Sequence, residues 1–187
     1  MEELLADIRK CTICKDFIEP NPVVLASKQS KTIIVGQAPG TKVHQSGIPW
    51  DDASGKQLRN WLGVTDDQFY DTNNFAIVPM GFCYPGKGKS GDLPPRRECA
   101  PKWHQPLLNE MPNVQLVILI GMYAQNYYLK DKAKRTLTET VDAFHEYLPD
   151  YFVLPHPSPR NRFWLTKNPW FKKEVLPQLK KIIKELL

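Results

Sequence analysis

The chain has 187 residues, 42% of them hydrophobic, which suits one well-packed core better than two ordinary domains. We therefore expect a single domain over residues 1–187. Lysine and arginine number 25 against 20 acidic residues, and the resulting net charge of +5 suits a polyanionic partner without requiring one. No apolar run approaches the length that crosses a bilayer, so we expect a soluble, cytoplasmic protein with no membrane partner.

Helical and strand patterns alternate along the chain. We expect an amphipathic helix over 1–10 and a further helix that is capped by Ser54, runs to Leu62 and stops at Gly63. A last helix is expected to open at Asn168 and Pro169. Buried strands are predicted at Thr32–Val35, Phe75–Val78, Leu116–Ile120 and Tyr151–Leu154, and a long surface loop over Tyr84–Pro95. This order predicts a three-layer α/β/α fold with a mostly parallel, four-stranded central sheet. Its ligand site should lie at the carboxyl ends of the strands.

Two loops follow predicted strands and therefore meet at that edge. The first is the turn Gly36-Gln37-Ala38-Pro39-Gly40, whose glycines let backbone amides approach a ligand, although a tight turn needs glycine for conformational reasons alone. The second is His156-Pro157-Ser158-Pro159-Arg160-Asn161, in which prolines stiffen the backbone around a histidine. His156 could be an ordinary loop residue. A stiff wedge followed by Arg160 and Arg162 nevertheless favours contact with a nucleic-acid backbone.

All four cysteines, Cys11, Cys14, Cys83 and Cys99, form a further pattern of one close pair and two distant members. In a reducing compartment, grouped cysteines hold metal more often than they form disulfides. Four thiolates can bind zinc or an iron-sulfur cluster, and the spacing alone does not choose between them. Four buried thiols without a metal are disfavoured because Cys11 and Cys14 lie in a polar segment.

Taken together, these motifs resemble the uracil-DNA glycosylase superfamily, and within it the iron-sulfur family-four enzymes. That family has a Gly-Glu-Ala-Pro-Gly turn, a Gly-x-Pro-aromatic segment and a His-Pro-Ser motif. The matching positions here are Gly36 to Gly40, Gly47 to Trp50, and His156 to Ser158. The four cysteines match the family's in order and nearly in spacing, which implies a 4Fe-4S cluster.

The resemblance implies base flipping, because the bond to be cut is hidden in the stacked duplex. Trp50 would stack on the flipped base, although it could instead be a core aromatic. His156 would donate a hydrogen bond to the departing base. Backbone groups of Gly36, Ala38, Pro39 and Gly40 would line the substrate pocket, and Ser158, Pro159, Arg160, Asn161 and Arg162 would form the wedge that grips DNA.

Two positions depart from the family pattern. Gln37 stands where the family carries a glutamate that activates water, and glutamine can orient water but cannot take its proton. Asp51 and Asp52 are candidates to replace that carboxylate, although adjacent acidic residues are more often solvated loop charge. Pro79 stands where the family carries an asparagine that reads uracil, so base recognition would pass to other groups, such as Asn73 or Asn74.

The leading hypothesis is a monomeric, monofunctional DNA glycosylase that removes a damaged base, uracil first, from DNA in base excision repair. No lysine is placed as a Schiff-base nucleophile. A second hypothesis is a DNA-damage-binding protein of the same fold that lost catalysis with its glutamate. A third is a zinc-containing nucleotide-binding α/β enzyme whose glycine turn grips a phosphate. Recruitment by a sliding clamp is left open.

Overall fold

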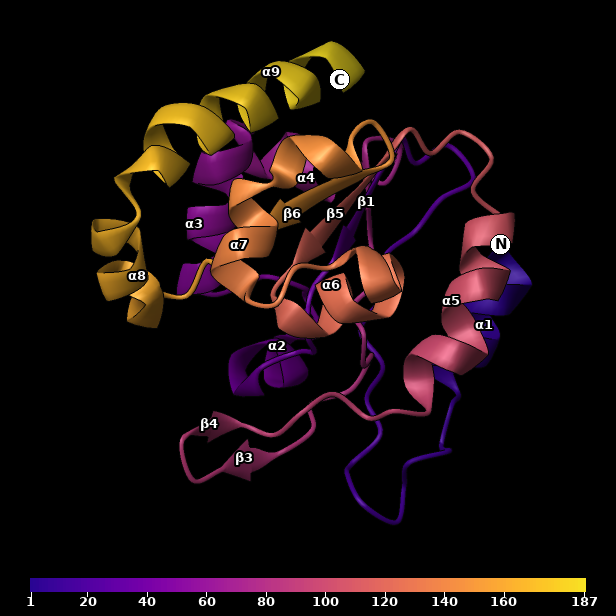
Figure 1. Ribbon diagram of the computed structural model, residues 1–187. Helices are drawn as coiled ribbons and strands as arrows, with labels where there is room; N and C mark the ends of the chain where they lie inside the picture. The colour runs from indigo at the N-terminus through magenta and orange to yellow at the C-terminus, as the bar shows by residue number, and fades with distance from the viewer.

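The computed structural model describes residues 1–187 and contains a four-stranded parallel sheet between two layers of helices (Figure 1). The strands are β1 (Thr32–Val35), β2 (Phe75–Ile77), β5 (Leu116–Ile120) and β6 (Tyr151–Leu154). Their order across the sheet is β2-β1-β5-β6, and each neighbouring pair runs parallel. The predicted three-layer α/β/α fold is confirmed.

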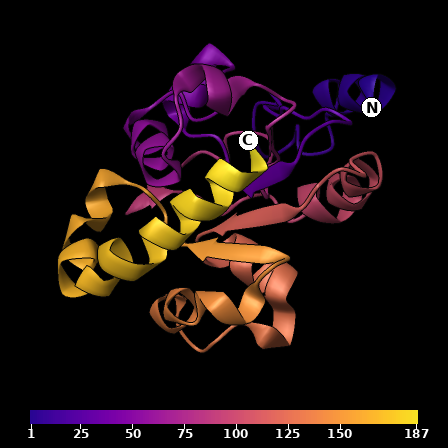
Figure 2. The ribbon, with the colours of Figure 1, turned by 90° about the horizontal axis from the view of Figure 1, so that it is seen from above.

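The sheet is buried on both faces because its strands carry apolar side chains at nearly every position, with buried Thr32 at the start of β1 as a polar exception. Ile33 and Val35 of β1 face one hydrophobic cluster, while Ile34 between them faces the other. The first cluster is covered by α1 (Glu2–Arg9), α5 (Cys99–Asn109) and α6 (Met122–Leu129). The second is covered by α3 (Ala53–Leu62), α4 (Asp66–Tyr70), α7 (Leu137–Asp142) and α9 (Leu176–Leu186). Figure 2 shows α9 lying across its face of the sheet.

The remaining elements are short. They are α2 (Thr41–Ser46), α8 (Arg162–Lys167), a π-helical turn at Phe171–Val175 that leads into α9, and 3-10 turns at Lys130–Lys132, Phe144–Tyr147 and Pro159–Asn161. None of the helices combines the length and the apolar character that a membrane span requires.

Three local predictions need correction. The cap of α3 is Asp52 rather than Ser54, because the Asp52 side chain accepts a hydrogen bond from Gly55 N. The strand expected to reach Val78 ends at Ile77, although Val78 N still donates to Ile34 O. The segment Tyr84–Pro95 is more than a loop: β3 (Lys87–Gly88) and β4 (Gly91–Asp92) pair as a small antiparallel hairpin. Two-residue strands are too short to show a hydrophobic period, so the sequence pattern concealed them.

Candidate active site

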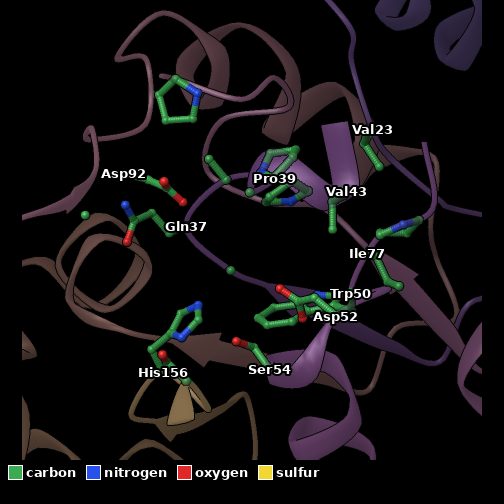
Figure 3. A pocket seen from close by; sticks show the side chains of 18 of the residues that line it. Val23, Gln37, Pro39, Val43, Trp50, Asp52, Ser54, Ile77, Asp92 and His156 are labelled. Atoms are coloured by element: carbon green, nitrogen blue, oxygen red, sulfur yellow. The ribbon is translucent and has the colours of Figure 1, made fainter. Parts of the chain in front are cut away.

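A pocket of about 440 Å³ opens at the carboxyl ends of the parallel strands, where the fold predicts a ligand site. Its walls come from the turn after β1, the segment that enters α3, the end of β2, the β3–β4 hairpin and the loop after β6 (Figure 3). The residues that line it are Val23, Gly36, Gln37, Ala38, Pro39, Gly40, Val43, Pro49, Trp50, Asp52, Ser54, Ile77, Pro79, Pro85, Gly91, Asp92, His156, Ser158 and Arg160. Most of the residues predicted from the motifs therefore share one cavity.

The glycine turn is fixed against the chain that follows β2. Met80 N donates to Gly36 O at 2.9 Å and Gly81 N donates to Gln37 O at 3.0 Å, so the turn extends the hydrogen bonding of the sheet. The Gln37 side chain reaches the hairpin, where its Nε2 donates to Leu93 O at 3.4 Å. This leaves the Oε1 atom of Gln37 as an acceptor beside the pocket.

Trp50 forms one wall of the pocket and is held in an unusual conformation. Its φ of 59° lies in the left-handed region, which a tryptophan rarely adopts. Arg59 Nη1 donates to its carbonyl at 3.2 Å, and its ring lies so close to Gly36 that a Cβ there would meet Trp50 Cζ2 at 2.8 Å. Backbone strain of this kind is kept where the surroundings determine it and often marks a functional site.

His156 faces Trp50 in the pocket. The centroids of the two rings are 5.7 Å apart, with 34° between the ring planes. Burial lowers the pKa of His156 below its ordinary value, and the Asp52 and Asp92 carboxylates oppose that shift only in part. The imidazole is therefore neutral near pH 7 and carries one N–H that can donate to a ligand.

Some of the residues predicted in the loop after β6 line the pocket, and others lie outside it. The Ser158 hydroxyl accepts from Arg160 N at 3.2 Å, and both residues line the pocket. Asn161 lies outside the lining, where its Nδ2 donates to His156 O at 2.7 Å and so fixes the histidine backbone. Pro159 is exposed at the start of the 3-10 turn, and exposed Arg162 lies over the ring of Phe163.

Pro79 is buried in the pocket wall, and its carbonyl is held by the buried His104. His104 Nε2 lies 3.0 Å from Pro79 O, and His104 Nδ1 lies 2.7 Å from Tyr128 Oη. Burial lowers the pKa of His104 to about 4, so the ring is neutral and donates from Nε2 while Nδ1 accepts from the tyrosine. Neither Asn73 nor Asn74 lines the pocket.

Sequence reasoning missed Asp92 and Ser54 as pocket residues. Asp92 lies on β4, inside the segment interpreted as a surface loop, and the only signal was the run of glycines at Gly86, Gly88 and Gly91 that accompanies tight hairpins. Ser54 was interpreted as a helix cap. Asp52, one of the two acidic candidates, lines the pocket but also caps α3, and Asp51 lies outside the lining.

The four cysteines line a second, small cavity between the segment that follows α1 and the start of α5. The cavity contains Cys11, Cys14, Cys83 and Cys99, with no acidic side chain among its lining residues. Burial raises the pKa of Cys83 to about 11 and of Cys99 to about 12, and it also raises the pKa of Cys14. No three histidine, cysteine, aspartate or glutamate side chains are close enough together to surround a single metal ion.

Comparison with known proteins is informative at the level of the family. A sequence model of the uracil DNA glycosylase superfamily matches residues 23–180, which is most of the chain. Among solved structures, the chain is similar to the solution NMR structure of a Methanosarcina acetivorans protein provisionally assigned as a uracil DNA glycosylase. The two share 16% sequence identity and a TM-score of 0.48, over 87% of this chain and 94% of that chain.

Proposed function

Because the chain belongs to the uracil DNA glycosylase superfamily, we propose that it is a monofunctional DNA glycosylase that flips a damaged base out of DNA and hydrolyses its N-glycosidic bond. Uracil is the first candidate base. The observation that carries the proposal is the pairing of Trp50 and His156 in one pocket beside the glycine turn. A flat apolar ring and a hydrogen-bond donor are what a flipped pyrimidine requires.

Trp50 would hold the flipped base by stacking, since its ring is kept in place by Gly36 below it and by Arg59 at its carbonyl. The pocket volume of about 440 Å³ lies within the range of small-molecule sites and is ample for one pyrimidine with its sugar. Recognition of uracil would rely on backbone groups of the turn and on Ser54, because Pro79 offers no side-chain donor.

His156 would act on the leaving group. As the bond between C1′ and the base nitrogen breaks, negative charge develops on the base, and a donor aimed at that charge lowers the barrier. A neutral imidazole suits this role, since it donates one hydrogen bond without placing a full positive charge in a half-buried site. Asn161 and the flanking prolines keep the ring in position.

The exposed residues Pro159, Arg160 and Arg162 at the rim would contact the DNA. Arginine binds phosphate through a planar group with several donors, and a rigid proline can fill the gap that the extruded nucleotide leaves. The net charge of +5 supports approach to a polyanion. These contacts would position the duplex or single strand without reading its sequence.

We propose that the four cysteines hold a 4Fe-4S cluster, with zinc as the alternative, because their thiols line one cavity that has no acidic side chain. The cluster is favoured over zinc because the order and spacing of the cysteines resemble those of the iron-sulfur family-four enzymes. Such a cluster supplies positive charge that keeps buried thiols deprotonated. Here it would connect the segment after α1 to the first turn of α5.

The colour and metal content of the purified protein test this cofactor. We expect a brown protein with broad visible absorption and about four iron atoms per chain. A colourless protein with one zinc per chain would overturn the cluster and favour a zinc-containing nucleotide-binding α/β enzyme.

Excision from labelled oligonucleotides tests the function itself. The wild type and His156→Ala are each incubated with single-stranded and double-stranded substrates that carry uracil, hypoxanthine, xanthine or 5-hydroxymethyluracil. We expect abasic sites at uracil, and a loss of about 10²–10³-fold in His156→Ala, the usual effect of removing one donor to developing charge. The exposed His145→Ala serves as the control. Measurable DNA binding without cleavage of any substrate would favour the damage-binding protein instead.

A further inference from the structure

Asp92 is the pocket residue that the sequence motifs leave unexplained. It lies on β4, opposite Lys87 in the hairpin, and the hairpin folds back over the glycine turn. Asp92 Oδ2 is 3.6 Å from the position that a Cβ on Gly40 would take, and the next residue, Leu93, accepts from Gln37. Figure 3 shows Asp92 and Gln37 side by side at one end of the pocket that also contains His156.

Of the two carboxylates in the pocket, Asp92 is the one that remains available. Asp52 Oδ1 accepts a hydrogen bond from Gly55 N at 2.8 Å and holds the first turn of α3. Asp92 takes part in none of the ion pairs of the structure. Its side chain has one hydrogen-bond partner, the Tyr84 hydroxyl, at the long distance of 3.5 Å. Its oxygens are therefore free to accept from a bound water.

An available carboxylate beside Gln37 provides what the glutamine cannot. A hydrolytic step requires a group that removes a proton from the attacking water, and a neutral amide does not accept that proton. With Nε2 engaged by Leu93, the Oε1 atom of Gln37 can accept one hydrogen of the water. The Asp92 carboxylate can accept the other. Gln37 on the glycine turn and Asp92 on β4 would thus share the role that a single glutamate has in the family-four turn.

We propose, on the basis of the proposed function, that Asp92 is the catalytic base of the hydrolysis and that Gln37 orients its water. The water oxygen forms the new bond to C1′ of the deoxyribose while the water proton moves to Asp92. The C1′–N bond breaks, and its electron pair leaves with the base, whose charge faces His156. The proton then passes to the released base, and the sugar keeps the new hydroxyl. DNA and one water molecule are the reactants that this balance requires.

Single-turnover excision by Asp92→Asn and Asp92→Ala tests the role. We expect Asp92→Asn to slow excision about 10²–10⁴-fold, the range for loss of a general base. Affinity for an oligonucleotide with a noncleavable 2′-fluorinated deoxyuridine should stay within about twofold of the wild type, since no binding contact is assigned to the carboxylate. Sodium formate should restore part of the activity of Asp92→Ala, because a small carboxylate can enter the space. Asp131→Asn makes the same chemical change at an exposed site and should match the wild type.

A second variant places the base at the other residue of the pair. Gln37→Glu in the Asp92→Asn background should recover activity, because a carboxylate again faces the water. Full activity of Asp92→Asn would overturn the proposal while leaving the glycosylase function intact. Loss of affinity in step with loss of rate, without formate rescue, would also overturn it and make Asp92 a binding residue. If the wild type excises no lesion, the proposed function fails first and the role of Asp92 falls with it.

Discussion

At the scale of single residues, the backbone and ring of Trp50 are fixed by several neighbouring groups at once. A left-handed backbone, a glycine under its ring and an arginine at its carbonyl all serve to present one face of the indole to the pocket. A side chain held this firmly loses little entropy when a base stacks on it.

Trp50→Ala should therefore weaken binding more than chemistry. We expect the affinity for an oligonucleotide with noncleavable deoxyuridine to fall roughly 5- to 150-fold, since stacking of a base on an aromatic ring contributes about 1–3 kcal/mol. Trp50→Phe keeps a ring and should lose less. Fluorescence anisotropy with the labelled oligonucleotide measures both, and equal affinity of Trp50→Ala and wild type would show that the indole packs the wall without touching the base.

The residues of the pocket differ in how far sequence could identify them. Gly36, His156 and the four cysteines stand in short motifs whose spacing is informative by itself. Asp92 has no motif, because its place beside Gln37 depends on how a hairpin folds back onto a turn more than fifty residues earlier in the chain. Asn161 also has a structural role that its motif position did not indicate, since its Nδ2 donates to His156 O.

At the scale of elements, the four strands were predictable because burial on both faces leaves near-continuous apolar runs. Helix ends were less certain. Asp52 and Ser54 are both good capping residues two positions apart, and only the geometry shows that Asp52 accepts from Gly55 N. The start of α3 therefore lies one turn from Trp50, and Gly55 in that turn packs against the Trp50 backbone in the pocket wall.

Gly55→Ala should lower the stability of the protein because of this contact. Alanine favours a helix interior over glycine by about 1 kcal/mol, so an isolated helix would gain stability. Here the new Cβ would lie 1.7 Å from Trp50 O, a backbone atom that cannot rotate away. We expect a net loss of about 2 kcal/mol or more, because overpacking of this kind costs about 1–3 kcal/mol even where side chains can adjust.

Urea unfolding monitored by circular dichroism measures the loss in Gly55→Ala. Lys56→Ala, at the neighbouring exposed position, is the control and should change stability little. A Gly55→Ala variant as stable as Lys56→Ala would mean that α3 can shift without disturbing Trp50.

At the scale of the whole molecule, α5 connects the two cavities. It begins at Cys99 in the cysteine cavity, and five residues later His104 reaches Pro79 O in the wall of the active-site pocket. Tyr128 on α6 completes the connection through His104 Nδ1. A cluster that fixes the start of α5 would thereby hold the pocket wall, and such long-range coupling leaves no trace in local sequence patterns.

The pH dependence of folding should report this buried histidine. The pKa of His104 is about 4 in the folded protein and about 6.5 when exposed, so the unfolded chain binds a proton first as the pH falls. The contribution of neutral His104 to the free energy of unfolding is complete above pH 6.5 and is lost on acidification toward pH 4, by about 3 kcal/mol in total and about 2 kcal/mol by pH 5.

His104→Gln keeps a donor for Pro79 O but does not titrate. Urea unfolding at pH 7 and pH 5 should show the wild type losing about 2 kcal/mol more than His104→Gln, whereas the exposed His145→Gln should behave as the wild type does. Equal losses in all three proteins would mean that His104 takes up its proton over the same pH range in the folded and the unfolded chain, so that at pH 5 the donor to Pro79 O would belong to an imidazolium.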